Sequence, residues 1–244
     1  MTEPSQSPRP GFQPTRWTIV SRARGDSPES KEALSDLCDA YWKPVFEFLR
    51  CEGRHEDESR ELTQAFFARL LGGGGISNAD PTKGRFRSYL LGSLKHFLAE
   101  KKRNEGRQKR GGKVRVDSLD EGGTDTSPGV QIADPEDTLA AKHFDREWAH
   151  TVMARSLTAV QARFEASGKE QHFNILKPWL VGETENLSQA EAAEALGLTL
   201  GAVKVAIHRL RGDFRKAVET EISHTLPRTG DLADEMRYLI EVLS

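Results

Sequence analysis

Cysteine is scarce in this chain of 244 residues, which holds only Cys38 and Cys51. Two cysteines are too few for a disulfide framework or for a four-cysteine zinc site. No run of about 18 consecutive apolar residues occurs, so we expect no helix that spans a membrane. The first fourteen residues also lack the apolar stretch of a signal peptide. These absences favour a cytoplasmic protein that holds no metal and does not contact a membrane.

Sequence motifs of catalysis are lacking as well. The four consecutive glycines at 72–75 are not followed by the Lys-Ser or Lys-Thr pair of a phosphate-binding loop. The histidines do not form a His-Glu-x-x-His motif, and no Gly-x-Ser-x-Gly turn is present. We therefore expect neither a catalytic site nor a cofactor.

The formal charge is only −2, but the charges are strongly segregated along the chain. Residues 83–113 hold eleven basic residues against two acidic ones, whereas residues 117–137 hold seven acidic residues and no lysine or arginine. A concentrated basic segment favours contact with a polyanion such as nucleic acid. The alternative is a solvated basic helix end.

Apolar residues recur at spacings of three and four along most of the chain, and no segment alternates with the period of a strand. The fold class is therefore predicted to be all-α. Pro44 is expected to break or kink a first helix that begins near Ser30, leaving a second short helix with Phe46 and Leu49. Further helices are expected over 57–71, 85–103, 137–166, 170–181, from Ser188 to Gly197, from Thr199 through Ala217, and over 231–243.

Two small helical domains are predicted, because residues 104–136 are rich in Gly, Asp, Ser, Thr and Pro and show no sustained period. The expected divisions are a flexible tail over 1–14, a helical bundle over 15–110, an acidic flexible linker over 111–136, a helix-turn-helix domain over 137–222 and an amphipathic extension over 223–244.

The strongest local signal lies between residues 188 and 216. Ser188 and Glu191 have the spacing of a capping box, Gly197 can end the helix that follows, and Thr199 can cap the next. Such a pair of helices forms a helix-turn-helix, whose second helix enters the major groove of DNA. The residues expected to contact bases or phosphates are Thr199, Gly201, Lys204, Val205, His208, Arg209, Arg211, Arg215 and Lys216. A helical hairpin without DNA contact is the alternative.

Two other segments carry weaker signals. Residues 83–110 interleave aromatic and basic side chains, which suits a surface that stacks bases and neutralises a strand. Phe86 and Phe97 fall on the apolar stripe and are expected in the core. Residues 56–61 form an acidic first turn, which fits compensation of the helix dipole and a docking surface equally well.

Together these features resemble a bacterial sigma factor of the small extracytoplasmic-function (ECF) class, over most of the chain. Residues 61–67, Glu-Leu-Thr-Gln-Ala-Phe-Phe, are similar to the family's region 2.2, which docks on RNA polymerase. Residues 84–90, GRFRSYL, running on to Lys102-Arg103, are similar to regions 2.3 and 2.4, which open and read the −10 element. Residues 187–215 resemble region 4.2, which reads the −35 element. GRFRSYLL and DEMRYLIEVL also resemble a subgroup expanded in planctomycetes, with a C-terminal extension.

This resemblance implies a non-enzymatic subunit that associates with core RNA polymerase and directs promoter recognition and transcription initiation. The implied contacts with the −10 element are Arg85, Arg87, Tyr89, Lys95, His96, Lys101, Lys102 and Arg103. The implied contacts with polymerase are Glu58, Glu61, Leu62, Gln64 and Phe67. The expected partners are core polymerase, through its β′ clamp helices and β flap, promoter DNA, and an anti-sigma factor or other regulator.

Two other functions stay open at this point. A stand-alone helix-turn-helix regulator would bind operators as a dimer without polymerase, but it leaves the basic, aromatic segment at 83–110 unexplained. An interaction protein would work through its terminal helix, so Lys204 and Arg209 would be dispensable. The apolar stripe of that helix favours packing on the second domain instead. Its members are Leu232, Met236, Leu239, Ile240 and Leu243.

Overall fold

The computed structural model describes residues 27–72, 76, 78–80, 84–110, 139–182, 188–223, 226 and 231–244. Regular structure in these ranges is α-helical and contains no strand, which confirms the all-α prediction. The helices are α2 (Pro28–Cys51), α3 (Glu56–Gly72), α4 (Phe86–Arg110), α5 (Leu139–Ala166), α6 (Glu170–Leu176), α7 (Pro178–Val181), α8 (Gln189–Leu196), α9 (Leu200–Ser223) and α10 (Leu232–Leu243). The expected tail over 1–14 and linker over 111–136 lie outside the described residues.

Helix α2 is continuous through Pro44, so the separate short helix that we expected after this residue does not form. Proline lacks the N–H that would bond to the carbonyl four residues earlier. The loss is offset by burial on both sides of Pro44, because Tyr41, Val45 and Phe48 are all nearly inaccessible to water. Packing on the core therefore overrides the local preference of proline.

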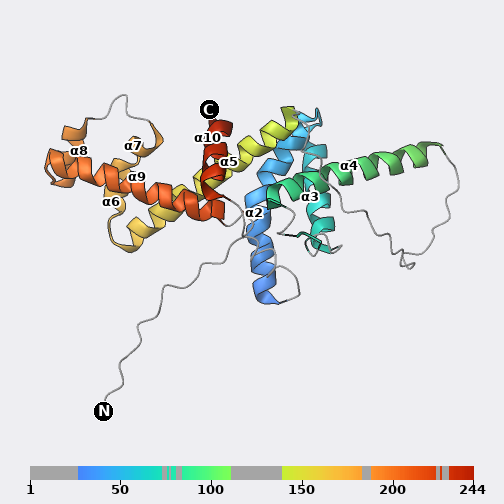
Figure 1. Cartoon of the computed structure of the whole chain (residues 1–244), viewed down its shortest axis with the longest axis horizontal. Helices are drawn as coiled ribbons and strands as arrows, with labels where there is room; N and C mark the ends of the chain where they lie inside the picture. Colours follow the sequence, from blue (N-terminus) through green and yellow to red (C-terminus); the bar gives the residue numbers. More distant parts are fainter. Residues whose placement is uncertain are drawn as a thin grey trace, which may run out of the picture.

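Helix α4 ends at Arg110 rather than at Arg103, where we predicted its end. The predicted end was set by the start of the segment rich in Gly, Asp, Ser, Thr and Pro, over 104–136. Residues 104–110 carry no aliphatic or aromatic side chain, but Glu, Arg, Gln and Lys are good helix formers. The helix thus extends beyond its last core contact, and in Figure 1 this part of α4 points away from the other helices.

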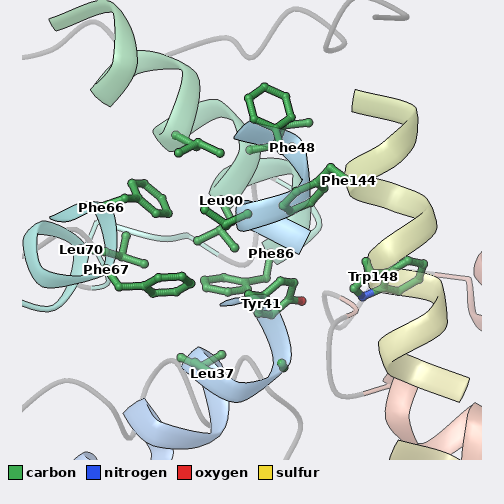
Figure 2. Close-up of a cluster of buried hydrophobic side chains, with 14 of the residues drawn as sticks. Leu37, Tyr41, Phe48, Phe66, Phe67, Leu70, Phe86, Leu90, Phe144 and Trp148 are labelled. Atoms are coloured by element: carbon green, nitrogen blue, oxygen red, sulfur yellow. The ribbon is translucent and has the colours of Figure 1, made fainter. Parts of the chain in front are cut away.

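The first hydrophobic core lies between α2, α3, α4 and the N-terminal half of α5 (Figure 2). Tyr41 of α2 and Phe86 of α4 meet edge to face, with ring centroids 5.4 Å apart. Phe144 and Trp148 of α5 close this core from one side, and both are 2% exposed or less. The core therefore includes side chains from both halves of the sequence.

The second core is built on the C-terminal half of α5. Its buried residues come from α5 to α9 and are Val160, Phe173, Leu176, Trp179, Ala192, Ala193, Val203, Ile207 and Leu210. Helix α5 is shared by both cores, and Figure 1 shows it running from α2 to α6. The boundaries that we expected for the two domains stay predictions.

The helix expected over 170–181 is divided at Lys177 into α6 and α7. Pro178 occupies the first position of α7, where its missing N–H costs no hydrogen bond and its fixed φ suits a helix start. The helical stretch predicted over 170–181 is therefore present, as two short helices that meet at Lys177.

Helix α10 begins at its N-cap Asp231, whose Oδ1 accepts a hydrogen bond from the N–H of Ala233 at 2.8 Å. The helix packs on α5 and α9, and its Leu239 joins Val218 and Ile222 in the first core. Ile240 is 60% exposed, so this member of the expected apolar stripe does not pack. None of the described helices is long and apolar enough to cross a membrane.

Candidate nucleic-acid interface

The turn between α8 and α9 has the capping that the sequence predicts. The backbone N–H of Ser188 donates to Glu191 Oε2 at 3.2 Å, and Ser188 Oγ accepts from the N–H of Ala190 at 3.1 Å. Gly197 ends α8 with φ 62°, a left-handed conformation that favours glycine. Thr199 Oγ1 then accepts from the N–H of Ala202 at 3.2 Å, which caps α9. The predicted helix-turn-helix geometry is thus present.

Helix α9 separates a buried face from a basic, exposed face. Val203, Ile207 and Leu210 point into the second core. The predicted contact residues on the other side of the N-terminal half are exposed, and these are Thr199, Gly201, Lys204, Val205, His208, Arg209 and Arg211. Val205 is one of the large apolar side chains left open to solvent, at 50% exposure. The arrangement brings the predicted −35 contacts onto one surface.

Two arginines of α9 already have partners within the chain. Arg211 donates to the carbonyl oxygen of Trp179 through Nη2 at 3.0 Å and through Nε at 3.3 Å, which ties α9 to α7. Arg215 Nε lies 3.1 Å from Glu219 Oε1, one turn further along the helix. The first contact occupies two N–H donors of Arg211, and the second places a carboxylate beside the charge of Arg215.

The C-terminal part of α4 forms a second basic surface. Lys101, Lys102 and Arg103 are exposed, and they follow Phe97 and Leu98, the last residues of α4 that pack in the first core. Among the other predicted −10 contacts, His96 is exposed, whereas Tyr89 and Lys95 are half-buried. Basic groups are therefore available along α4 from its middle to Arg103.

The N-terminal end of α4 differs from what we expected. Arg87 is buried, with 3% of its surface exposed, so in this conformation it cannot contact DNA. Its Nε lies 3.2 Å from Asp145 Oδ1 of α5, and its Nη1 pairs with Oε1 of Glu235 in α10. Arg85 Nε lies 2.9 Å from the other oxygen of Glu235. Hydrophobic periodicity could not predict these contacts, because they join three helices that are distant in sequence.

Burial changes the acid–base properties of this cluster. Burial lowers the pKa of the Arg87 guanidinium from its ordinary value, while the charge of Asp145 opposes that shift. Burial and the hydrogen bond to Asp145 raise the pKa of Tyr238 to about 12. Tyr238 therefore remains a neutral hydroxyl that donates to Asp145 Oδ2, at 2.6 Å.

The outer face of α3 is acidic and polar, with Glu58, Glu61 and Gln64 exposed. Leu62 and Phe67, which we expected to contact polymerase, instead lie in the first core at 2% and 4% exposure. Their places on the apolar stripe of α3 explain this burial.

Sequence reasoning missed Trp42 on the neighbouring helix α2. Its ring stacks on Phe67 with centroids 5.7 Å apart and remains 37% exposed. A half-exposed tryptophan is typical of docking surfaces. The available signal in the sequence was that Trp42 does not share the three- and four-residue spacing of the core positions of α2.

A family model described as ECF sigma factor matches residues 17–220, which include both basic surfaces, the α3 face and the helix-turn-helix. The chain belongs to the ECF sigma factor family. This ECF sigma factor therefore has the role of an RNA polymerase sigma factor in transcription initiation, and its partners are core polymerase and promoter DNA. Helix α10 lies after the matched residues. No curated protein and no solved structure matches the chain.

The described residues contain no group of three or more His, Cys, Asp or Glu side chains that could hold a metal ion. Both surfaces offer guanidinium, ammonium and imidazole groups, and α4 adds the aromatic ring of Tyr89. These groups bind phosphates and bases by charge, hydrogen bonding and stacking.

Proposed function

We propose that this ECF sigma factor reads the −35 element of promoters with the N-terminal half of α9 and the −10 element with α4. The main support for the proposal is that Lys204, His208 and Arg209 are exposed on one face of α9. This face lies opposite the buried stripe of the second helix in a capped helix-turn-helix. The N-terminal residues of the second helix are those that reach base edges in this motif.

The charge distribution of α9 supports the same orientation. Its N-terminal half contains Lys204, Arg209 and Arg211 but no carboxylate, and the first carboxylate of the helix is Asp213. This half can approach phosphates without repulsion from acidic groups. Binding to duplex DNA is then expected to weaken steeply as salt concentration rises, because phosphate contacts release counterions.

The exposed basic end of α4 supports contact with an unpaired strand. Lys101, Lys102 and Arg103 are placed to neutralise phosphates, while the rings of Tyr89 and His96 lie further back on the same helix. Stacking of a base on such a ring is worth about 1–3 kcal/mol. This gain offsets the cost of unstacking a base from the duplex, which is a few kcal/mol.

The outer face of α3 is the proposed docking surface for the β′ clamp helices of polymerase. Glu58, Glu61 and Gln64 are exposed on α3, and the half-exposed ring of Trp42 stacks on Phe67 of the same helix, so this region offers both polar and aromatic groups. The β flap is the proposed contact of the α9 region, and an anti-sigma factor or other regulator is a further proposed partner. Membership of the planctomycete-type subgroup, with α10 as its C-terminal extension, belongs to the same proposal.

Run-off transcription with purified core polymerase on fragments of the source genome tests this function. We expect transcripts that depend on the added protein. Lys204→Ala should weaken them, whereas Lys31→Ala, the same change at an exposed position of α2, should not. Failure to associate with polymerase, together with the absence of dependent transcripts, would contradict the proposal. Specific binding of duplex DNA by the chain alone would instead favour a stand-alone regulator.

A further inference from the structure

The carboxylate of Glu235 is fully buried at 0% exposure, although it belongs to a helix beyond the family match, which ends at residue 220. Its two oxygens meet two different cations: Oε2 lies 2.9 Å from Arg85 Nε, and Oε1 pairs with Arg87 Nη1. Burial of a carboxylate is unfavourable unless it is paired. The position of Glu235 beneath both arginines therefore indicates a specific contact rather than incidental packing.

Tyr238 reinforces this contact from the same face of α10. Its ring lies 4.7 Å from the guanidinium carbon of Arg87 and 5.8 Å from that of Arg85. Its hydroxyl donates to Asp145 Oδ2 of α5 at 2.6 Å. Because residues three apart share one face of a helix, Glu235 and Tyr238 together cover the start of α4.

We propose that α10 is an intramolecular latch that covers the N-terminal end of the DNA-binding surface of α4, at Arg85 and Arg87, in the free protein. In this closed form, the carboxylate of Glu235 pairs with Arg85 and Arg87. In the open form, from which α10 has been released, a nucleic-acid phosphate takes the place of this carboxylate. The inference rests on the proposed contact of Arg85 and Arg87 with the −10 element. Guanidinium groups bind carboxylates and phosphates through the same charge-assisted hydrogen bonds, so the two anions compete for one place.

The latch also connects the two basic surfaces. The Leu239 side chain of α10 packs with Val218 and Ile222 near the end of α9, while Glu235 holds α4. Release of α10 thus exposes the start of α4 and removes a link between α4 and α9. Only the open form binds DNA through the start of α4. The apparent affinity for DNA is therefore the affinity of the open form multiplied by the fraction of molecules that are open.

The test compares full-length Glu235→Gln with Glu241→Gln, which is the same change at an exposed position of α10. Hydrogen exchange of residues 231–244 and 85–95 reports opening, and exchange of α2 reports whether the bundle remains folded. Fluorescence anisotropy with a labelled, mixed-sequence single-stranded DNA of about 12 nucleotides reports access to α4. We expect Glu235→Gln to speed exchange of α10 and to tighten DNA binding about tenfold, and Glu241→Gln to change neither.

Tyr238→Phe is a milder variant for use if Glu235→Gln does not fold. It keeps the aromatic ring and removes only the hydroxyl that donates to Asp145. A smaller shift in the same direction is expected for both measurements. Exchange of α10 that is unchanged in both variants would overturn the latch, and so would faster exchange without tighter DNA binding.

Transcription with core polymerase distinguishes the two levels of the proposal. If wild-type protein initiates transcription and the opened variant neither binds DNA more tightly nor initiates more, the latch is wrong and the proposed function stands. If the opened variant and wild-type protein both fail to initiate, the proposed function is wrong, and the latch proposal falls with it.

Discussion

The guanidinium carbon of Arg87 lies 4.3 Å from the centre of the Trp148 ring, where α4 meets α5. Tyr238 offers a second ring to the same group, and the carboxylates of Asp145 and Glu235 pair with its nitrogens. Arginine suits such a site because its planar cation stacks on rings and donates at its edge. This is how a residue from the most basic segment of the chain becomes buried in the bundle.

Replacement of Arg87 by methionine should destabilise the protein strongly. Methionine keeps much of the side-chain volume but leaves Asp145 and Glu235 without their shared cation. Removing one partner of a buried ion pair typically costs about 3–5 kcal/mol. Urea denaturation followed by tryptophan fluorescence measures the loss. The control is Arg146→Met, the same change at an exposed position of α5, which should change the free energy of unfolding by less than about 0.5 kcal/mol. Equal losses of stability in the two variants would contradict the structural role of Arg87.

Stability should fall at low pH through the pair between Lys43 of α2 and Glu147 of α5, whose Nζ and Oε2 lie 2.9 Å apart. Burial opposes ionisation of Glu147, but the hydrogen bond and charge of Lys43 outweigh it, so the pKa of the carboxyl is lowered. A lowered pKa means that the stabilisation is complete above the ordinary pKa of glutamate and disappears as pH falls through the folded-state value.

The expected size of this effect is modest, because Lys43 is 62% exposed and solvent screens the pair. Between pH 6 and pH 3, wild-type protein should lose about 0.5–1 kcal/mol more than Glu147→Gln does. Thermal or urea denaturation at a series of pH values measures the difference. The comparison is repeated in a His150→Gln background, since His150 Nδ1 lies 3.5 Å from the same carboxylate. Parallel pH profiles in both backgrounds would contradict the prediction.

Two glycines in and near α9 should respond oppositely to alanine. Gly197 has φ 62°, and a Cβ there meets no atom within 4 Å, so the cost of Gly197→Ala is backbone strain of about 1–2 kcal/mol. Gly212 lies inside α9, also with open space for a Cβ, so Gly212→Ala should stabilise by about 0.5–1 kcal/mol. Chemical denaturation of both variants checks the pair, and a stabilising Gly197→Ala would contradict the assigned turn.

The features that the sequence predicted correctly are those set by residues close together in the chain. The capping box at Ser188 and the end of α8 at Gly197 both depend on neighbouring residues, and the structure confirms both. The exposed face of Lys204 and Arg209 follows from the helical period in the same way. These features require no knowledge of which helices pack together.

Tertiary contacts explain the rest. Arg87 belongs to a basic run, and charge density alone favoured an exposed position for it. Its burial depends on Asp145 and Glu235, which reach it from two other helices. Leu62 and Phe67 were assigned to polymerase by resemblance, but both side chains are buried in the first core.

Arg209→Ala and Gln64→Ala should separate the two binding activities of this sigma factor. Both side chains are exposed, on α9 and α3 respectively, so neither change should unfold the protein. Loss of a base-reading arginine typically costs about 1–3 kcal/mol, so Arg209→Ala should weaken transcription that depends on the −35 element about tenfold or more and leave polymerase binding intact. Gln64→Ala should weaken binding to core polymerase instead.

Leu62→Asp is not a usable alternative, because Leu62 is 2% exposed and the change would disrupt the core. Pull-down of core polymerase and run-off transcription on promoters with and without a −35 element measure the two activities. Equal losses of both activities in both variants would contradict separate surfaces on α3 and α9.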